Sequence, residues 1–455
     1  MAKKKEKTLE EKLQEALVPE NQWPYILPEN WCWTRLENIN KYRGKSVTPQ
    51  NNDDILFELY SVPSCENEYP EILTGSKIGS SKQLVEKKDV LLCKINPRIN
   101  RVWQVLEYTN NTLLASSEWI VVRNRLLNSD YLVWYFKSPY FRECMLSNVS
   151  GVGGSLMRAK PKAVMEYPVP LAPLSEQKRI VNRIESLFAK LDEAKEKIQQ
   201  VLDGAEMRKA AILHKAFTGE LTKTWRKENG ISEDSWEVKK LSDCGNWYGG
   251  GTPSKTHPEY WEKGNILWIT SKDMKSDYIE DSQQHINSYG VENSSAKYIE
   301  EHALICVMRS GILRHSFPVA VIKKPFTVNQ DLKVLVPNKM INIEYLLFIC
   351  KYKEQSILNS CMKNGTTVES INFDKLKNFS IMIPAEIEQI RIVNIIKKFL
   401  CRENDVLNKC NKFITSIATM KKSILAKAFR GELGTNNPTE DSALNLLKEV
   451  LQDKS

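Results

Sequence analysis

A stretch of about 45 residues occurs twice in this chain at one fixed spacing. The hexamer EQKRIV at 176–181 returns as EQIRIV at 388–393, and ILHKAFTGEL at 212–221 returns as ILAKAFRGEL at 424–433. Both pairs are offset by 212 residues, so neither copy carries an insertion or deletion between its two markers. A segment that keeps its length so strictly is expected to form one continuous, rigid element.

Apolar residues recur within each copy in alternating steps of four and three, which is the spacing of a coiled-coil seam. We therefore predict two long helices, within 173–220 and 384–433, that end near Gly219 and Gly431. The predicted core of the coiled coil consists of Ile180, Ile184, Leu187, Leu191, Ile198, Ile392, Ile396, Phe399, Val406, Phe413 and Ile417.

Two helices of equal length in one chain can pair antiparallel as a spacer of fixed span. About 40 residues at a rise of about 1.5 Å give a rod of roughly 60 Å. The plainer alternative is two amphipathic helices that pack on anything nearby. Two residues depart from the pattern: Glu403 interrupts the second seam, and Gly204 inside the first helix costs about 1 kcal/mol relative to alanine. The pattern gives no function for either residue.

The two segments of about 150 residues that precede these helices repeat more weakly. KKDVLLC at 87–93 resembles EEHALIC at 300–306, and DYLVWYFKS at 130–138 resembles EYLLFICKY at 344–352. Five short runs predict strands: VLLCKI at 90–95, EWIVVR at 118–123, ILWIT at 266–270, ALICVM at 303–308 and VAVIKK at 319–324. DYLVWYF and EYLLFIC open helices, so we predict an α+β fold for each segment and a pseudo-two-fold repeat overall. The predicted boundaries are 1–27 for a helical extension, 28–172 and 235–383 for the two variable domains, 173–220 and 384–433 for the spacer helices, 221–234 for a linker and 434–455 for a helical tail.

The composition is that of a globular protein. The 455 residues predict two to four domains, and 42% of them are hydrophobic. No apolar run reaches the roughly 18–20 residues that cross a bilayer, and no apolar signal region follows the basic N-terminus, so we expect a cytoplasmic protein. The ten cysteines are scattered without a C-x-x-C pair, which signals neither zinc nor a disulfide framework. The net charge of +9 favours a polyanionic partner only slightly.

The repeated motifs resemble one known family. The pairs PLSEQKRIV with KAFTGEL and EIEQIRIV with KAFRGEL, and GGGTPSKTHPEYWEKGNILWITSKDM at 249–274, resemble the specificity subunits of type I restriction-modification systems. The resemblance covers essentially the whole chain. YRGKSVTPQ at 42–50 departs from it, because this stretch lacks the glycine run and the Pro-Glu-Tyr-Trp of its counterpart.

The resemblance implies a subunit without catalysis of its own. Each variable segment would be a target-recognition domain that reads one half of a split, asymmetric DNA sequence. The two spacer helices would form an antiparallel coiled coil that sets the gap between the half-sites. Implied partners are double-stranded DNA, two modification (methyltransferase) subunits and, in the full complex, restriction (translocase and nuclease) subunits. S-adenosylmethionine, ATP and magnesium would bind to those partners, with no cofactor or metal held directly by this chain.

Two rival interpretations were weighed, a self-sufficient methyltransferase or nuclease and a structural coiled-coil scaffold. INPRIN at 95–100 lacks the second proline and the aromatic residue of an adenine methyltransferase motif. RGKS at 43–46 imitates the end of a phosphate loop, but Ile39 stands where G-x-x-x-x-G-K-[ST] requires glycine. The sequence therefore predicts no catalytic residues.

DNA recognition combines phosphate contacts with contacts to base edges, so the candidates are basic, amide and hydroxyl side chains on exposed loops. For any single residue, a solvated surface position is the plainer interpretation. In the first domain we predict Lys45, Ser46, Lys77, Ser80, Ser81, Lys82, Arg98, Arg101, Arg158 and Lys160. In the second domain we predict Thr252, Ser254, Lys255, Thr270, Ser271, Lys272, Arg309, Arg314, Asn329, Gln330, Lys363, Asn364, Thr366 and Thr367.

Both ends of the chain predict amphipathic helices. TLEEKLQEAL at 8–17 begins with a Thr-x-x-Glu capping box, and SALNLLKEVL at 442–451 has a similar apolar face. These helices either pack on the chain's own body or contact partner subunits, and the sequence leaves both open. It also leaves open the target sequence, the gap length and the stoichiometry of the complex.

Overall fold

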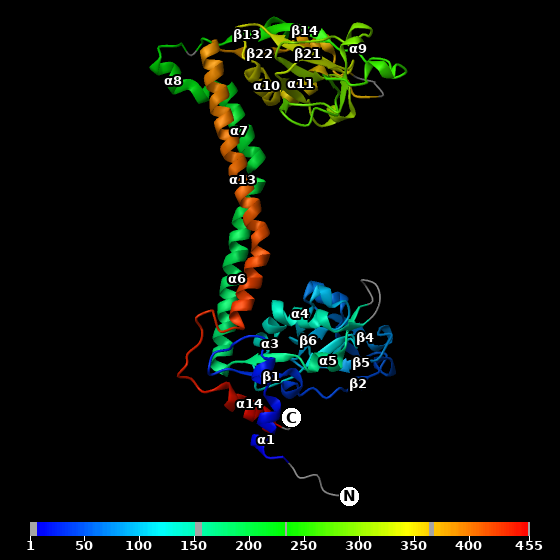
Figure 1. Ribbon diagram of the computed structural model, residues 1–455, viewed down its shortest axis with the longest axis vertical. Helices are drawn as coiled ribbons and strands as arrows, with labels where there is room; N and C mark the ends of the chain where they lie inside the picture. Colours follow the sequence, from blue (N-terminus) through cyan, green and yellow to red (C-terminus); the bar gives the residue numbers. More distant parts are fainter. Residues whose placement is uncertain (1–6, 151–156, 233, 364–367, 454–455) are drawn as a thin grey trace. The chain divides into compact units, whose positions relative to one another are not determined.

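The computed structural model describes residues 7–150, 157–232, 234–363 and 368–453. The chain forms two compact units: the first comprises Met1–Ile198 with Lys412–Ser455, and the second comprises Gln199–Asn411. Each unit therefore contains one variable segment, the beginning of one spacer helix and the end of the other (Figure 1). Within the described ranges, no helix is both long enough and apolar enough to cross a bilayer.

The predicted spacer helices are present. The first consists of α6 (Leu174–Asp203) and α7 (Ala205–Phe217), separated at Gly204. The second is α13 (Glu386–Ala428), an unbroken helix of 43 residues. Gly219 and Gly431 follow these helices with φ values of 80° and 76°, which confirms them as C-terminal stops.

The helices pair antiparallel within each unit. In the first unit, Asp192 of α6 accepts a hydrogen bond of 2.6 Å from Lys421 of α13. Nearer the start of α6, Ile180 shares a core with Phe429, which follows the end of α13. In the second unit the relation is mirrored, because residues at the end of α7 share a core with residues at the start of α13.

The predicted coiled-coil core is only partly a core of two helices. Ile180, Ile184, Ile392 and Ile396 are fully buried, but they lie within the hydrophobic cores of the two units. Val406 is 42% exposed, so its assignment to the core is wrong. A strict seven-residue repeat drifts by about 20° per heptad around a straight helix, which turns this position towards solvent. Ile417 is buried, and Leu187, Leu191, Ile198, Phe399 and Phe413 are half-buried.

The first variable segment folds into two main sheets with the strand orders β2-β5-β8-β3-β4 and β7-β6-β9. VLLCKI and EWIVVR supply the antiparallel neighbours β6 and β9, and DYLVWYF lies in α3, as predicted. The strands are β1 (Cys32–Arg35), β2 (Ser46–Val47), β3 (Leu56–Tyr60), β4 (Glu71–Thr74), β5 (Lys82–Leu84), β6 (Val90–Cys93), β7 (Val102–Gln104), β8 (Thr112–Ala115), β9 (Trp119–Val122), β10 (Val149–Ser150), β11 (Arg158–Ala159) and β12 (Pro168–Leu171). The helices are α2 (Leu36–Ile39), α3 (Ser129–Phe136), α4 (Pro139–Ser147) and α5 (Pro161–Met165), with 3-10 turns at Glu20–Gln22, Pro49–Asn51, Pro63–Asn67, Gly75–Lys77 and Pro97–Ile99.

The second variable segment has the sheets β14-β21-β18-β19-β16 and β17-β15-β20. The predicted strands ILWIT, ALICVM and VAVIKK are β15, β18 and β19, and EYLLFIC lies in α10. The strands are β13 (Glu237–Lys240), β14 (Gly245–Gly249), β15 (Ile266–Ile269), β16 (Tyr278–Ile279), β17 (Gln284–Ile286), β18 (Ala303–Val307), β19 (Val319–Ile322), β20 (Phe326–Val328), β21 (Leu332–Pro337) and β22 (Ser380–Ile383). The helices are α8 (Lys223–Glu228), α9 (Ser288–Glu292), α10 (Ile343–Tyr352), α11 (Glu354–Cys361) and α12 (Phe373–Lys377), with 3-10 turns at Glu220–Thr222, Leu241–Cys244, Pro258–Tyr260 and Gly311–Arg314.

The two segments repeat one topology, as their sequences predicted. β6 lies between β7 and β9 in the way that β18 lies between β19 and β21. β3 runs parallel to β8, and β15 runs parallel to β20. In both segments the first strand pairs with the last, β1 with β12 and β13 with β22, directly ahead of a spacer helix. The predicted α+β fold with an internal repeat is confirmed.

The terminal helices pack on the chain's own body. α1 (Leu9–Ala16) begins with the predicted capping box of Thr8 and Glu11. α1 lies against α14 (Ala443–Gln452) in the first unit (Figure 1). Their apolar faces belong to one core, with Leu13 from α1 and Leu447 and Val450 from α14. Of the two alternatives that the sequence left open, the structure shows self-packing.

Candidate nucleic-acid interface

In the second unit, the ends of several strands meet at one edge. The backbone N–H of Gly251 donates to the carbonyl of Val328, and that of Asn329 donates to Ile269, both at 3.0 Å. These two bonds join the ends of β14, β15 and β20. β18 and β21 are antiparallel neighbours, so the end of β18 lies beside the start of β21. Only three residues separate the end of β20 from the start of β21, which places the end of β18 at the same edge. Loops from four distant parts of this segment therefore gather at one place.

This edge carries basic, amide and hydroxyl side chains. Arg309 follows β18 and is exposed, and no carboxylate of the described residues pairs with it. Thr252 follows β14 and donates a hydrogen bond to Gln330, which follows β20. Lys272, in the loop after β15, is exposed as well. The arrangement presents donors and positive charge side by side, which is what contacts to phosphates and base edges require.

The first unit builds the same edge from corresponding strands. The N–H of Ser116, after β8, donates to Tyr60 at the end of β3 over 3.1 Å. Lys94 directly follows β6, and its N–H donates to Glu118, which precedes β9, over 3.0 Å. The loop between β6 and β7 carries Arg98 and Arg101 in the position where the loop between β18 and β19 carries Arg309 and Arg314.

A second segment joins each of these basic loops. Ile95 forms a β-bridge with Arg158, and Arg309 forms the equivalent bridge with Ser370. Both bridging segments lie shortly before a spacer helix. The repeat therefore gives each unit one basic edge of the same construction, although the side chains on the two edges differ.

The repeated Glu-Gln pair anchors each spacer helix to its own unit. Gln177 Oε1 accepts a 3.0 Å hydrogen bond from the N–H of Asn128, which caps α3. Gln389 Oε1 accepts a 2.8 Å bond from the N–H of Asn342, which caps α10. The glutamine is thus conserved between the two copies because it holds the beginning of the spacer against the main helix of the variable segment.

The glutamates at these positions are buried and use different partners. Glu176 is fully buried and accepts from Trp31 Nε1 at 2.8 Å and from Asn436 Nδ2 at 2.9 Å. Glu388 is 1% exposed and forms an ion pair with Arg226 Nη1 at 2.6 Å. Asn436 follows the second spacer helix and Arg226 follows the first, so each glutamate binds the chain just past the opposing helix.

Comparisons with known proteins agree with this architecture. A family model described as "Type I restriction modification DNA specificity domain" matches residues 233–415. The EcoR124I/EcoR124II specificity subunit from Escherichia coli is 40% identical over 176 residues, 39% of this chain and 44% of that relative. The EcoKI specificity subunit from Escherichia coli strain K12 is 23% identical over 358 residues, 73% of each chain. Residues 233–415 match the DNA specificity domain of type I restriction-modification systems, and the chain is similar to their specificity subunits.

A solved structure extends the likeness of this chain to the whole fold. The HsdS subunit from Thermoanaerobacter tengcongensis superimposes with a TM-score of 0.71 at 20% identity, covering 90% of this chain and 99% of that one. At this identity the likeness concerns the fold. The match to the EcoR124I/EcoR124II subunit spans less than half the length of that relative.

Most residues that were predicted to contact DNA are exposed, although their contact with DNA stays a prediction. Four predicted residues lie on neighbouring elements rather than on the loops of the shared edge: Lys45 directly before β2, Ser46 on β2, Lys77 in a 3-10 turn and Ser81 directly before β5. Asn364, Thr366 and Thr367 lie outside the described residues. The exposed residues are Lys45, Ser46, Lys77, Ser80, Ser81, Arg98, Arg158, Lys160, Thr252, Ser254, Lys255, Lys272, Arg309, Arg314, Gln330 and Lys363, and Ser271 is half-buried.

The expectation of exposure is wrong for Lys82 and Asn329. Lys82 is 9% exposed, and its Nζ turns back to the carbonyl of Ser80 at 2.9 Å, so burial lowers the pKa of this ammonium below its ordinary value. Asn329 is 8% exposed, and its Oδ1 accepts from the N–H of Asp331 at 3.2 Å. Both side chains hold a loop in place and leave little for a ligand to contact.

Other predicted residues already have partners within the chain. Thr270 Oγ1 donates to Asp273 at 2.9 Å within a turn. Arg101 pairs with Glu66 at 2.8 Å, and only 16% of its side chain is exposed. In the pairs of Arg158 with Glu118 and of Arg314 with Glu369, the arginines stay 51% and 65% exposed, so these two can exchange their partners for phosphates. Sequence reasoning missed Lys94, because the predicted strand VLLCKI included this residue, whereas β6 ends at Cys93.

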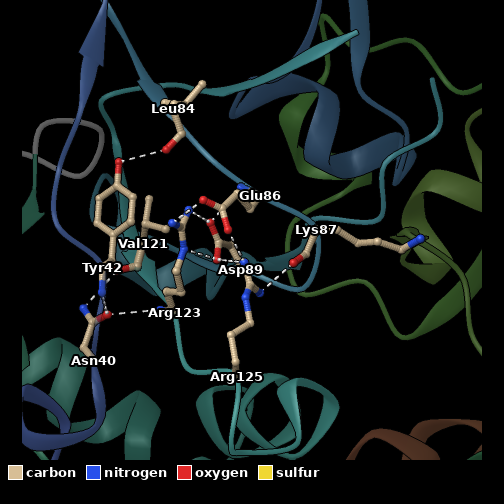
Figure 2. Close-up of polar contacts among 9 residues, drawn as sticks. All are labelled: Asn40, Tyr42, Leu84, Glu86, Lys87, Asp89, Val121, Arg123 and Arg125. Atoms are coloured by element: carbon tan, nitrogen blue, oxygen red, sulfur yellow. Dashed lines mark hydrogen bonds and ion pairs between the residues drawn. The ribbon is translucent and has the colours of Figure 1, made fainter. Parts of the chain in front are cut away.

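Figure 2 shows a charged cluster at the opposite ends of β6 and β9 from the shared edge. The fully buried Asp89 accepts two hydrogen bonds from Arg123, at 2.8 and 2.7 Å. Glu86 accepts from Arg125 at 2.7 Å and from Arg123 at 2.6 Å, and the bond from Arg125 lowers the pKa of the Glu86 carboxyl. These arginines are neutralised within the domain, so we assign them to the structure of the turn rather than to DNA.

Replacing Gly250 with alanine is expected to disrupt the shared edge of the second domain. A Cβ at this position would lie 2.1 Å from the carbonyl oxygen of Val328, which is backbone and cannot rotate away. Such overpacking typically costs about 1–3 kcal/mol. Gly311 is the matched control, because among the described residues no atom lies within 4 Å of its added Cβ, and alanine there should change stability by about 0.5 kcal/mol or less. Urea unfolding of both variants tests this, and equal losses would contradict it.

Proposed function

We propose that this chain is the sequence-specific DNA-binding part of a type I restriction-modification complex. Each target-recognition domain would read one half of a split, asymmetric target with its shared edge. The observation that carries the proposal is the repetition of one fold and one basic edge with different side chains. Two similar domains of this kind present the same geometry to a duplex and different hydrogen-bonding groups to its bases.

The spacer helices are proposed to set the gap between the half-sites. A helix of 43 residues, the length of α13, is about 65 Å long. One turn of B-DNA is about 34–36 Å, so a rod of this scale is long enough to hold two readers one turn or more apart. Changing the length of the rod would then change the gap and leave both half-sites as they are.

The partners and cofactors follow from the same proposal. We infer that two modification subunits dock on the coiled coil, that restriction subunits join in the full complex, and that the chain itself performs no catalysis. S-adenosylmethionine, ATP and magnesium would be bound by the partners. Support for docking comes from a groove between α6 and α13 in the first unit, lined by Leu187, Leu191, Met420 and Ile424 and flanked by lysines.

Mapping of methylated adenine in cells that carry this subunit and its modification partners tests the proposal. The expected result is one motif split into two unlike halves by a fixed gap. No motif at all would favour the scaffold alternative. Methylation by the purified chain alone, with S-adenosylmethionine, would favour the self-sufficient enzyme.

Arg309→Ala is expected to weaken DNA binding and to relax one position in one half-site. A bidentate contact of arginine to a base is worth about 1–3 kcal/mol of discrimination. Lys339→Ala is the matched control, because Lys339 is exposed just past the other end of β21. This substitution removes the same charge away from the shared edge. Salt-dependent binding to the mapped target measures both variants. If both variants lost the same DNA affinity, the effect of Arg309→Ala would be explained by the change in net charge alone.

A further inference from the structure

The two irregularities of the spacer repeat meet in space. Gly204 separates α6 from α7. Glu403 of α13 occupies a seam position and is only 7% exposed, although its side chain is a carboxylate. Arg208, one turn past the break, joins them. Its Nη2 donates to the carbonyl of Val201 at 2.7 Å, and its Nε donates to Glu403 Oε1 at 3.0 Å. In an unbroken helix the carbonyl of Val201 accepts from the amide of residue 205.

The glycine at 204 leaves room for this arginine. The backbone of Gly204 has φ of −77° and ψ of −3°, whereas a regular helix has ψ near −42°. A Cβ on this residue would lie 2.7 Å from Arg208 Nη1. The break and the guanidinium therefore belong to one arrangement, in which Arg208 connects the loosened turn to the opposite helix.

The ion pair between Arg208 and Glu403 is not needed to hold two spacer helices together, because the other end of the helix pair has apolar residues at the corresponding positions. With the offset of 212, Glu403 corresponds to Leu191 and Arg208 corresponds to Met420. In the first unit those two residues line one apolar groove between α6 and α13. The Glu403 side chain is 8% exposed and the Arg208 side chain is 37% exposed. An ion pair with a buried carboxylate is on average no more stabilising than apolar residues of similar volume, so its retention here points to geometry.

We propose that Arg208 is a positioning residue that fastens the break at Gly204 to α13, and that this fastening restricts the subunit to one gap between half-sites. The inference rests on the proposed function, in which the helix pair sets the gap. Without Arg208, the turn at Gly204 becomes a hinge, because glycine permits more backbone conformations than any other residue. A change of one base pair in the gap requires only about 3.4 Å and about 35°.

The first variant uses the residues that the chain itself places at the corresponding positions. The double variant Arg208→Met with Glu403→Leu removes the fastening without leaving an unpaired buried charge. The triple variant adds Gly204→Ala, which restores a continuous helix. The control is Lys421→Met with Asp192→Met, which removes the 2.6 Å ion pair of the first unit, where no glycine interrupts the helix.

Each variant is assembled with its partner subunits, and methylation is measured on the mapped target and on targets with gaps one base pair longer and shorter. The double variant is expected to lower the preference for the native gap about tenfold, or about 1.4 kcal/mol, with an unchanged melting temperature. The triple variant should return the preference to that of the wild type, and the control should keep it throughout.

Three results would overturn the inference. They are an unchanged gap preference in the double variant, an equal loss in the control, and no recovery in the triple variant. In each case a complex with the wild-type chain that methylates a split motif leaves the proposed function standing. A complex with the wild-type chain that methylates no split motif would overturn the proposed function itself, and this inference with it.

Discussion

Replacing Phe429 with alanine is expected to destabilise the first unit by about 3–5 kcal/mol, although this residue follows the second spacer helix. Phe429 is 1% exposed, and its ring lies 5.2 Å from that of Tyr131 and 5.1 Å from that of Tyr135, both in α3. Its counterpart in the repeat is Phe217, the last residue of the first spacer helix. Phe217→Ala should destabilise the second unit by a similar amount, because its ring packs on Tyr345 at 5.3 Å.

The two substitutions test the antiparallel arrangement because their effects cross over. Hydrogen exchange should show lost protection in α3 for Phe429→Ala and in α10 for Phe217→Ala. Val406→Ala on α13 is the control, because this side chain is 42% exposed and its loss should change stability by about 0.5 kcal/mol or less. If Phe429→Ala loosened α10 and left α3 protected, the antiparallel pairing would be wrong.

This crossing-over explains what the sequence could and could not predict about the spacer. The constant offset and the heptad spacing predicted two helices of equal length, and the glycine stops were placed correctly. Periodicity identifies the apolar face of a helix but not what covers it. Ile180 and Ile392 were therefore assigned to a coiled-coil core, whereas they lie in the cores of the two units. Val406 keeps the period and faces solvent.

The candidate interface was predictable as a set of loops and not as individual side chains. Strand-like runs located the ends of β6, β15 and β18, and parallel and antiparallel pairing then gathers such ends at one edge. The exposure of a single side chain depends on hydrogen bonds that composition does not reveal. Asn329 shows this, because an asparagine two residues before Asp331 commonly bonds to the backbone of a turn. That local signal was available and indicated a structural residue.

Gly204 and Glu403 had no explanation in the sequence because each was considered within its own helix. Their partner, Arg208, has no distinctive motif and lies 195 residues from Glu403. A one-dimensional repeat compares equivalent positions, whereas an antiparallel pair brings non-equivalent positions together. The two residues that break the repeat, one in each copy, can therefore be recognised as neighbours only once the helices are known to pair antiparallel.

Replacing Arg226 with methionine is expected to destabilise the second unit by about 3–5 kcal/mol, because it leaves the carboxylate of Glu388 buried without its ion pair. The side chains of Arg226 and Glu388 are 6% and 1% exposed. Arg226 also donates to the carbonyl of Gly219 at 2.7 Å, so its loss releases the turn that ends the first spacer helix. Urea unfolding measured by the exposure of Trp225 and Trp236 would report the loss.

The double variant Arg226→Met with Glu388→Gln separates the ion pair from mere packing. In the described part of the chain, Arg226 Nε and Glu388 Oε2 have no hydrogen-bond partner, so the pair is incompletely satisfied. Removing both charges should therefore recover most of the stability that Arg226→Met alone loses. In the first unit, Glu176 occupies the equivalent position with the neutral donors Trp31 and Asn436. In the double variant no unpaired buried charge remains. If it were as unstable as Arg226→Met, the lost stability would come from the packing of the arginine side chain.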